Sequence, residues 1–299
     1  MLIRVLTWNL FHARDGHPAA RADLRSTLLG TPVFGDGHLH LNRKLHLPMA
    51  RALAALGPHV AALQEVPTAA IDTIVSVTGM DAIWVRTGPL IGPRRLRDRL
   101  ARANPDLWRS HEGNANVLLV DPRVGGFARP ARRLILNDGE MMWTVGMDAR
   151  VPAVDMWHWV AQRRGVVAAR LVIPGARDVA VACVHLHNGR VRAMATAEAQ
   201  RALAVMRGLE APGGAILAGD LNAVVGHPAQ AALVDGGLDD RGPAAAIDRI
   251  LRRTLVCTEP PAALPDSART VRVPHRGRWT PVLLSDHAPV MGTWRLPAA

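Results

Sequence analysis

Hydrophobic residues along the chain gather in short runs that predict β-strands. Many of these runs are almost continuously apolar, whereas a strand with one face in water would alternate with polar residues. They therefore predict strands that are covered on both faces. The runs are IRVLTW (3–8), HVAAL (59–63), NVLLV (116–120), GVVAARLVI (165–173), DVAVACVHL (178–186), GAILAGDL (214–221) and PVLLSD (281–286).

Segments with helical spacing of apolar residues lie between these runs. Residues 47–56 end at Gly57-Pro58, residues 194–209 end before Pro212, and a shorter helix is predicted over 227–237. The alternation of strands and helices predicts layers of helices packed on sheets. The sequence shows no internal repeat, low-complexity tract or linker, so residues 1–299 are expected to form a single domain.

Three stretches are predicted to be long surface loops or insertions: residues 11–46, 86–112 and 137–163. The first contains His38, His40 and His46, whose spacing matches no common zinc site, so a solvated loop or hairpin is expected.

The other two stretches have unusual compositions. Residues 94–103, RRLRDRLARA, predict a solvated helix face, with a nucleic-acid contact as the alternative. Residues 137–163 are rich in Trp and Met and predict a hairpin that covers the core. The alternative is an apolar flap that faces the substrate, because loops often carry specificity.

Composition sets limits on the class of protein. A hydrophobic content of 49% suffices for a large core, and no apolar run is long enough for a membrane helix. We expect a soluble, cytoplasmic protein without stable membrane insertion. The formal charge of +11 suits a polyanionic partner, but Lys44 is the only lysine among 36 basic residues. That bias toward arginine makes the charge modest support for a phosphate-bearing substrate.

The two cysteines, Cys183 and Cys257, do not have the spacing of a metal site. Cys183 lies within the apolar run VAVACV, which predicts a buried, unreactive thiol.

Polar side chains stand at or near the C-terminal ends of several predicted strands. Singly, each has an ordinary explanation, such as a turn or a hydrogen-bonded amide. Their repetition along the chain is harder to ascribe to packing. The residues concerned are Asn9, Glu65, His185, Asp220 with Asn222, and Asp286 with His287.

Together these residue types have complementary chemistry. Carboxylate and amide oxygens suit Mg²⁺ or Mn²⁺ better than zinc, which would favour clustered His or Cys. A His–Asp pair fixes the imidazole tautomer and raises its basicity. No Ser or Cys nucleophile with an adjacent base is evident, so direct attack by water is the simplest mechanism.

In their order, TWN, QE, GN, HLHN, GDLN, ID and SDH resemble the motifs of the endonuclease/exonuclease/phosphatase superfamily. These metal-dependent phosphoesterases include deoxyribonuclease I, apurinic/apyrimidinic endonucleases, sphingomyelinases and inositol polyphosphate 5-phosphatases. The resemblance runs from Asn9 to His287. It implies an α/β fold, a four-layer sandwich of two stacked mixed β-sheets flanked by helices, with the site at the strand ends.

The resemblance also implies roles for individual residues. Glu65 matches the principal metal ligand, assisted by Asn9 and Asp286. Asp220 and Asn222 match the pair that positions the attacking water and the phosphate. His287 matches the acid/base histidine, which Asp248 of the ID motif would orient. His185 is expected to be catalytic and Asn114 to face the substrate, the latter on the weakest match.

Position 185 also separates branches of the superfamily. Apurinic/apyrimidinic endonucleases generally have a tyrosine where this chain has His185, and the chain contains no tyrosine. Repair of abasic sites is therefore disfavoured.

We predict hydrolysis of a phosphodiester, with Mg²⁺ or Mn²⁺, in a nucleic acid. The alternatives are a sphingomyelinase-like or small-molecule phosphatase or phosphodiesterase activity, and a non-catalytic binding protein with the same fold. The sequence gives no indication of oligomeric state. The resemblance makes one spatial prediction: Asn9 and Glu65 should lie side by side across adjacent strand ends.

Overall fold

The structure is a computed structural model. It describes residues 1–15, 33–35, 38–40, 44–88, 113–161, 163–188, 191–209 and 211–299. The arginine-rich segment 94–103 lies outside the described residues.

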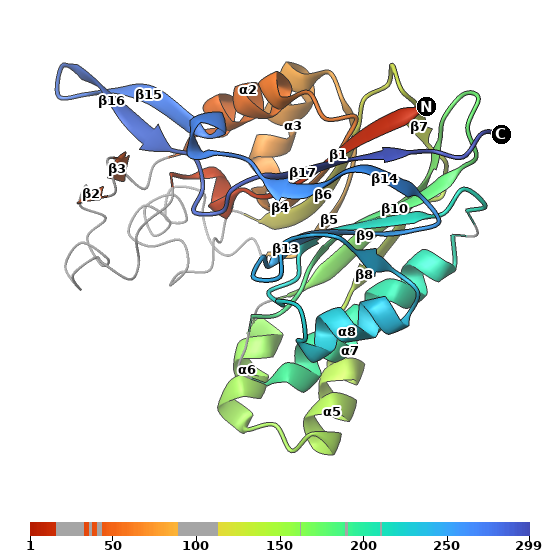
Figure 1. Cartoon of the computed structure of the whole chain (residues 1–299). Coiled ribbons are helices and arrows are strands. Elements are labelled where there is room, and N and C mark those ends of the chain that lie inside the picture. Colours follow the sequence, from red (N-terminus) through yellow and green to blue (C-terminus); the bar gives the residue numbers. More distant parts are fainter. Residues whose placement is uncertain are drawn as a thin grey trace.

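Two large mixed sheets form the centre of the molecule (Figure 1). The first sheet has the order β14 (Val256–Ala263), β17 (Val290–Arg295), β1 (Leu2–Asn9), β4 (Val60–Pro67), β6 (Asn114–Val120) and β5 (Asp81–Arg86). The second has the order β12 (Asp239–Asp240), β13 (Asp248–Arg253), β11 (Ala215–Asp220), β10 (Val179–His185), β9 (Gly165–Val172) and β7 (Gly126–Phe127), while β8 (Arg132–Ile135) also pairs with β9.

The central strands of each sheet are buried on both faces, which explains the continuous apolar runs. Ile3 and Val60 of the first sheet share one hydrophobic cluster with Val181 and Ile216 of the second, so the sheets stack face to face. Every residue of β10 is buried. The predicted α/β sandwich of two mixed sheets flanked by helices is confirmed.

Helices cover the outer face of each sheet (Figure 1). α2 (His46–Leu56) and α3 (Thr68–Thr78) pack on the first sheet, and α7 (Arg192–Arg207) and α8 (Pro228–Asp235) pack on the second. The predictions over 47–56, 194–209 and 227–237 are therefore confirmed. Helix α3 was not predicted, because the sequence of this helix, TAAIDTIVSVT, is rich in β-branched residues, which favour strands.

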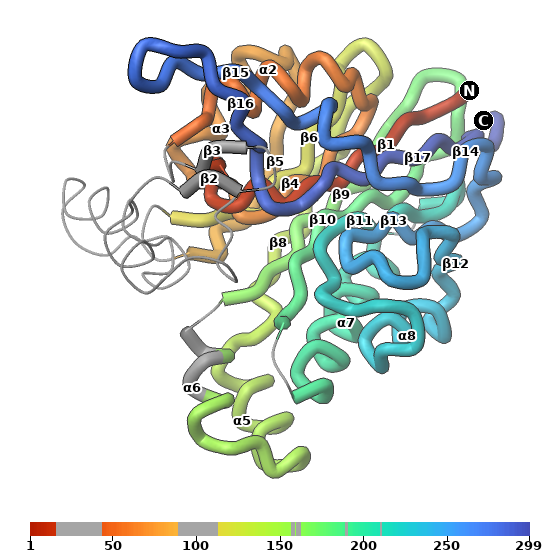
Figure 2. Tube along the Cα trace, turned by 60° about the vertical axis from the view of Figure 1, so that its left-hand side comes forward, coloured from red at the N-terminus to blue at the C-terminus, as the bar shows by residue number. Residues whose placement is uncertain are grey.

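The Trp- and Met-rich stretch is helical, so the predicted hairpin over 137–163 is wrong. It forms α5 (Gly139–Asp148) and α6 (Ala153–Ala161), which lie beyond α7 at one end of the molecule (Figure 2). The side chain of Asp138 caps α5 by accepting a hydrogen bond from the Met141 N–H (3.0 Å).

The described part of 11–46 contains three short elements: the 3₁₀ turn η1 (Phe11–Ala13), β2 (Val33–Gly35) and β3 (His38–His40). β2 and β3 pair as an antiparallel hairpin, one of the two forms expected here. His46 does not belong to a loop, because it is the first residue of α2.

The run PVLLSD was expected to be a strand over 281–286, and its first half is one. Pro281–Leu283 belong to β16 (Arg278–Leu283), which pairs with β15 (Thr270–His275) in a two-stranded sheet separate from the two large ones. β15 follows the short 3₁₀ turn η2 (Asp266–Ala268). Ser285, Asp286 and His287 therefore lie in the loop from β16 to β17.

Two smaller predictions concern Cys183 and the membrane. Cys183 is a fully buried free thiol whose pKa burial raises to about 12, as expected for an unreactive cysteine. Its sulfur accepts a hydrogen bond from Nε2 of Gln64 and donates one to the carbonyl of Leu63.

Within the described parts of the chain, the helices are too short or too polar to cross a lipid bilayer.

Candidate active site

The polar strand ends of the two sheets meet at one edge of the sandwich. β1 and β4 run parallel, and their pairing ends with Asn9 beside Gln64, one residue before Glu65 in β4. β10 and β11 also run parallel and place His185 beside Asp220. Asp248, the first residue of β13, lies beside Asp220 on the other side. In parallel strands the C-terminal ends share an edge, so the strand order itself gathers these groups.

Gly219 allows β10 and β11 to approach closely beside the site. A Cβ atom at Gly219 would lie 1.8 Å from the carbonyl oxygen of Val184, so any side chain would force the strands apart. In the GDLN motif, close packing of the strands therefore requires the glycine, and the chemistry of the site uses the aspartate that follows it.

Glu65 reaches the site through an irregularity in the sheet. The pairing of β4 with β6 is interrupted between Leu63 and Val66, and Glu65 has a φ of 53° there. Its carboxylate oxygens lie 3.3 Å from Nε2 of His12 and 4.0 Å from Nδ1 of His185. The side chain is 19% exposed, so a small ligand can reach it.

Asn9 links the two sheets. Its Nδ2 donates to Oδ2 of Asp220 (3.1 Å), and its Oδ1 accepts from the backbone N–H of Phe11 (3.0 Å). Asn9 thus contacts Asp220 and Glu65 contacts His185, and these two partners lie 3.5 Å apart.

Asp220 is the central acceptor of the cluster. Its Oδ1 accepts from the backbone N–H of Asn222 (2.9 Å). Its Oδ2 lies 3.5 Å from Nε2 of His185 and 4.0 Å from Nε2 of His287. Asp220 is almost completely buried, so its carboxylate depends on these polar neighbours rather than on water.

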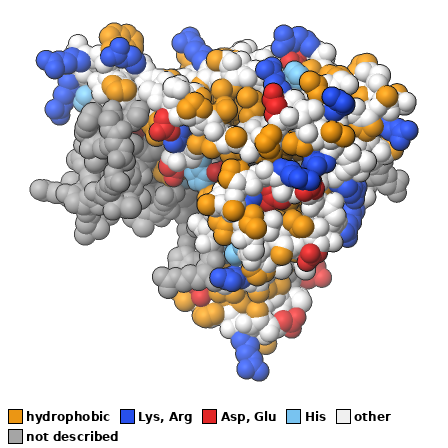
Figure 3. All heavy atoms as spheres, viewed as in Figure 1, with side chains coloured by type: hydrophobic (Ala, Val, Ile, Leu, Met, Phe, Trp, Pro, Cys, Tyr) orange, Lys and Arg blue, Asp and Glu red, His pale blue; other side chains and the backbone are white. Residues whose placement is uncertain are grey.

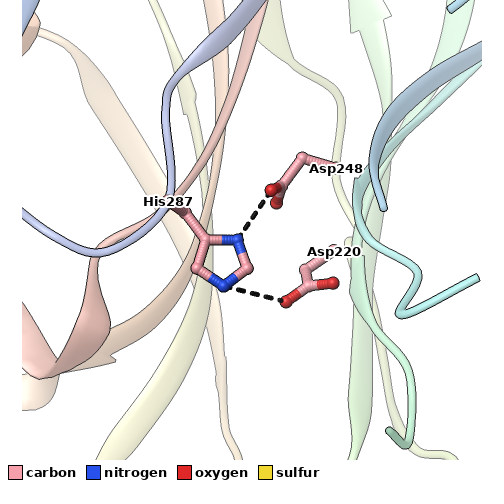
Figure 4. A group of neighbouring side chains, drawn as sticks. All are labelled: Asp220, Asp248 and His287. Carbon is pink, nitrogen blue, oxygen red and sulfur yellow. Dashed lines mark hydrogen bonds and ion pairs between the residues drawn. The ribbon is translucent and has the colours of Figure 1, made fainter. Parts of the chain in front are cut away.

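His287 and Asp248 form a close pair at 2.6 Å between Nδ1 and Oδ2 (Figure 4). The imidazole ring points between the two carboxylates of Asp248 and Asp220. Burial opposes the charged imidazolium, but the bond to Asp248 and the surrounding negative charges outweigh it and raise the pKa of His287 to about 10. His287 is therefore a cation that can donate a proton from Nε2.

His185 has the opposite character. NH1 of Arg164 lies 2.7 Å from its Nε2. A guanidinium can only donate, so Nε2 accepts and the ring is neutral, with its proton on Nδ1 toward Glu65. Burial and the charge of Arg164 lower the pKa of His185 well below its usual value. Of the two histidines that approach Asp220, His185 is therefore neutral and His287 is charged.

The remaining expected residues lie at the border of this cluster. Nδ2 of Asn222 donates to the carbonyl of Leu186 (2.9 Å) and lies 3.3 Å from Nε2 of His185. Asn114, the first residue of β6, contacts Nδ1 of His12 at 2.8 Å. Asp286 is 43% exposed and approaches Nε2 of His287 to 4.0 Å.

The loop that carries His287 is held to β1 by two hydrogen bonds, and a third bond lies within the loop. Oγ of Ser285 donates to the carbonyl of Asn9 (2.6 Å) and accepts from the His287 N–H (3.1 Å). Nε1 of Trp8 donates to the carbonyl of His287 (2.9 Å). The TWN and SDH motifs therefore position each other across the chain.

Several residues of the site have positive φ angles. Glu65, Asn222 and Ser285 have φ values of 53°, 48° and 63°, and His12 has 56°. L-residues seldom adopt this region, and such strain concentrates at functional sites.

A metal ion could be held by two different groups of side chains. Asp220, Asp248 and His287 lie close enough together to hold one ion. However, the hydrogen bond between His287 and Asp248 already occupies Nδ1 of His287 and Oδ2 of Asp248. Glu65 with Asn9, and Asp286 at the border, offer oxygen donors instead. Those donors fit Mg²⁺ or Mn²⁺.

Three residues of this region were missed in the sequence. His12 lies in a stretch read as a surface loop, yet it is buried and contacts both Glu65 and Asn114. Arg164 was not singled out, because only the antiparallel register of His185 with Gly165 brings it to the site. Glu198 lies on α7, where one buried acid has no sequence signal.

Glu198 on α7 holds the segment after His185 by a hydrogen bond to its backbone. The Trp159 indole N–H donates to its Oε1 (2.5 Å), and the backbone N–H of His187 donates to its Oε2 (2.7 Å). Asn137 extends this network, since it donates to the carbonyl of Trp159 (2.6 Å) and accepts from the N–H of Arg164 (2.7 Å). Helices α6 and α7 thus fix the backbone on which His185 and Arg164 stand.

The substitution Glu198→Gln is expected to destabilise the fold by about 1–3 kcal/mol, because one of two buried N–H donors then loses its acceptor. Burial raises the pKa of Glu198 from 4.5 to about 7. A raised pKa contributes stability that is complete below the unfolded value and is lost as pH rises through the folded value. The deficit of the variant should therefore shrink as pH rises from 4.5 to about 7 and stay constant above that.

Denaturant unfolding of both proteins across this pH range measures the effect. Glu140→Gln on α5, an exposed position, is the matched control and should change little. A deficit that is constant with pH would mean that the Glu198 carboxyl ionises normally inside the fold.

The surface view places the site in a hollow. Histidine and acidic side chains gather in the middle of the face seen in Figure 3. They lie between the upper part, which bears β15 and β16, and the lower part, which bears α5 and α6.

The chain belongs to the endonuclease/exonuclease/phosphatase family, whose model matches residues 6–287. It is accordingly a phosphoesterase of a superfamily whose members generally depend on a divalent metal ion. No curated protein matches the chain in a sequence comparison.

Solved structures with the same fold are distant in sequence. A family protein from Bacteroides thetaiotaomicron is 14% identical with a TM-score of 0.64, and the match covers 100% of this chain and 99% of that one. A mannosyl-6-phosphatase from the same species is 14% identical with a TM-score of 0.60, covering 98% and 99%. The human Nocturnin catalytic domain, solved with a bound sulfate anion, is 13% identical with a TM-score of 0.59, covering 99% and 93%.

Proposed function

We propose that this protein hydrolyses phosphodiester bonds in nucleic acid, with Mg²⁺ or Mn²⁺ held by Glu65, Asn9 and Asp286. The observation that carries the proposal is the convergence of Glu65, Asp220 and the His287–Asp248 pair at one edge, although they come from different strands of two sheets. When bound, the ion would polarise the phosphoryl oxygen and stabilise negative charge on the leaving oxygen.

The side chains of the chain supply the proton transfers. Asp220 and Asn222 orient a water molecule, and the Asp220 carboxylate takes its proton as the water oxygen forms the new bond to phosphorus. The bond from phosphorus to the leaving oxygen breaks, and that oxygen receives the proton of His287 Nε2. Asp248 keeps His287 protonated and oriented.

Arg164 and His185 complete the phosphate site. Arg164 brings a permanent positive charge next to the neutral ring of His185, at 2.7 Å. A guanidinium at this place binds and orients a phosphate group.

Two alternatives are supported by particular observations. A phosphatase acting on a small phosphorylated molecule gains support from Arg164, since a phosphate monoester carries more charge than a diester, and from the similar fold of the Bacteroides thetaiotaomicron mannosyl-6-phosphatase. A lipid diester gains support from α5, where Trp143 is 71% and Met147 is 62% exposed.

A metal-supplemented substrate panel tests the proposal. It contains DNA, RNA, sphingomyelin vesicles and phosphorylated small molecules, and Asp220→Ala serves as the blank. We expect the nucleic acids to be hydrolysed fastest. Rapid turnover of only sphingomyelin or only monoesters would replace this proposal with the corresponding alternative.

Metal titration by calorimetry accompanies the panel. Mn²⁺ should bind the parental protein, and Glu65→Gln should weaken that binding at least tenfold, because the amide offers no charge to the ion. Asp235→Asn, an exposed carboxylate at the end of α8, is the control. Unchanged Mn²⁺ binding to Glu65→Gln would remove Glu65 from the proposed metal site.

A further inference from the structure

The β15–β16 hairpin stands apart from the two main sheets next to the site. It forms its own two-stranded sheet, and its strands are joined by Arg276 and Gly277, which have φ values of 46° and 75°. Two consecutive residues with positive φ make the tight turn that suits a hairpin. Val273 and Val282 on its inner face are buried in the core beneath α2 and α3, so the base of the hairpin is firmly packed.

The outer part of the hairpin is strongly basic. Arg272, Arg276 and Arg278 are exposed, and the sequence from Ser267 to Ser285 contains no acidic residue. Among the described residues, no ion pair joins these three arginines to an acidic side chain. Figure 3 shows cationic side chains gathered over the hairpin at the upper left. This concentration of positive charge attracts anions.

Trp279 adds a flat apolar surface to these charges. Its side chain is 65% exposed, and it is the one large hydrophobic side chain of the hairpin with that exposure. In the register, Trp279 lies opposite Pro274, and the neighbouring pair on the same face is Arg272 with Pro281. Arg278 pairs with His275 on the opposite face, and Arg276 lies in the turn. An exposed indole with a guanidinium group on the same face can bind an unpaired base together with a phosphate.

The hairpin is continuous with the loop of the site. β16 leads through the buried Leu284 to Ser285, whose hydroxyl donates to the carbonyl of Asn9 (2.6 Å). Arg269, at the foot of β15, donates from NH1 to the Ser285 carbonyl (2.9 Å). From Trp279 to Leu283 the strand advances four residues, or about 13 Å. The position of the indole relative to His287 is therefore fixed by the packed strand and loop between them.

We propose that the β15–β16 hairpin binds the single-stranded part of a nucleic-acid substrate as it leaves the active site. Trp279 stacks on an unpaired base, and Arg272, Arg276 and Arg278 contact the phosphates. This inference rests on the proposed function and narrows its substrate class to single strands, because bases in a duplex do not expose a face for stacking. A lipid surface fits less well, since Trp279 alone offers little apolar area for insertion.

Binding of a labelled thymidine oligonucleotide, measured by fluorescence anisotropy in EDTA to prevent turnover, tests this. We expect Trp279→Ala to weaken binding by about 5- to 100-fold, the range that base stacking contributes. Trp143→Ala on α5 removes an equally exposed indole distant in sequence from the hairpin and should bind like the parental protein. The double variant Arg276→Ser/Arg278→Ser should reduce the slope of log affinity against log salt by about 1.4.

Three outcomes would overturn the proposal: equal oligonucleotide binding by Trp279→Ala and Trp143→Ala, tighter binding of duplex than of single strand, or Trp279-dependent binding to phosphatidylglycerol vesicles without oligonucleotide binding. The proposed function is tested separately by hydrolysis of bis(p-nitrophenyl) phosphate with Mn²⁺, a diester too short to reach the hairpin. If the parental protein hydrolyses it while the hairpin variants bind normally, only the hairpin proposal fails.

Discussion

Replacing Asp220 with asparagine is expected to reduce phosphodiester hydrolysis by about 10²–10⁴-fold. Asp220 accepts hydrogen bonds from Asn9 and Asn222 and lies 3.5 Å from His185 and 4.0 Å from His287. An amide of the same size cannot take a proton from water, and its NH₂ group would face the Asn9 donor. Initial rates at saturating metal measure the loss.

The fold must survive for this result to have meaning. Asparagine keeps the volume of the side chain, so the thermal unfolding midpoint should change little compared with the loss of rate. Asp235→Asn on α8 is the matched control, because it makes the same chemical change at an exposed position. A folded Asp220→Asn protein with the parental rate would show that Asp220 does not take part in the reaction.

Replacing His287 with alanine is expected to reduce hydrolysis by a similar factor, about 10²–10⁴-fold. The variant loses the proton donor whose pKa is raised to about 10 by Asp248 and the nearby carboxylates.

Replacing Asp248 with asparagine should also reduce hydrolysis, through its effect on the His287 imidazole. Without the Asp248 carboxylate the pKa of His287 falls from its raised value, because the hydrogen bond and negative charge of Asp248 no longer favour the imidazolium, so the activity of this variant should begin to fall at a lower pH.

A double-mutant cycle separates positioning by Asp248 from an independent role. Asp248 contacts Nδ1 of His287 at 2.6 Å, and if it acts only through the imidazole, Asp248→Asn should have little further effect in the His287→Ala protein. Additive losses would mean that Asp248 meets the substrate or the metal directly. Comparing pH–rate profiles of the single variants gives a second readout that a purely structural defect would not move.

Much of the fold was predictable because burial on both faces leaves a clear pattern. β10 and β11 are apolar at nearly every position, and the structure buries all of them. Helices α2, α7 and α8 were predicted from a different signal, the helical spacing of apolar residues that face the core. The errors arose where local composition misleads. The β-branched residues of α3 resemble a strand, and the Trp- and Met-rich α5 and α6 resemble a hairpin.

The strand before Ser285 was predicted, but the sheet to which it belongs was not. PVLL is as apolar as a core strand, but only Val282 and Leu284 are buried, under α2 and α3. A short apolar run shows that a segment is partly buried, and it does not show which sheet the segment joins.

The sequence by itself determined the chemistry of the protein: carboxylates, amides and histidines that follow apolar strands in the order of a known family. It could do so because each polar group stands next to a strand that burial makes recognisable. Only the tertiary structure decided which groups meet. The bulge at Glu65, the contact of Arg164 with His185 and the buried position of His12 depend on register and on the stacking of the two sheets. Those are relations between residues far apart in the chain, and local sequence patterns do not encode them.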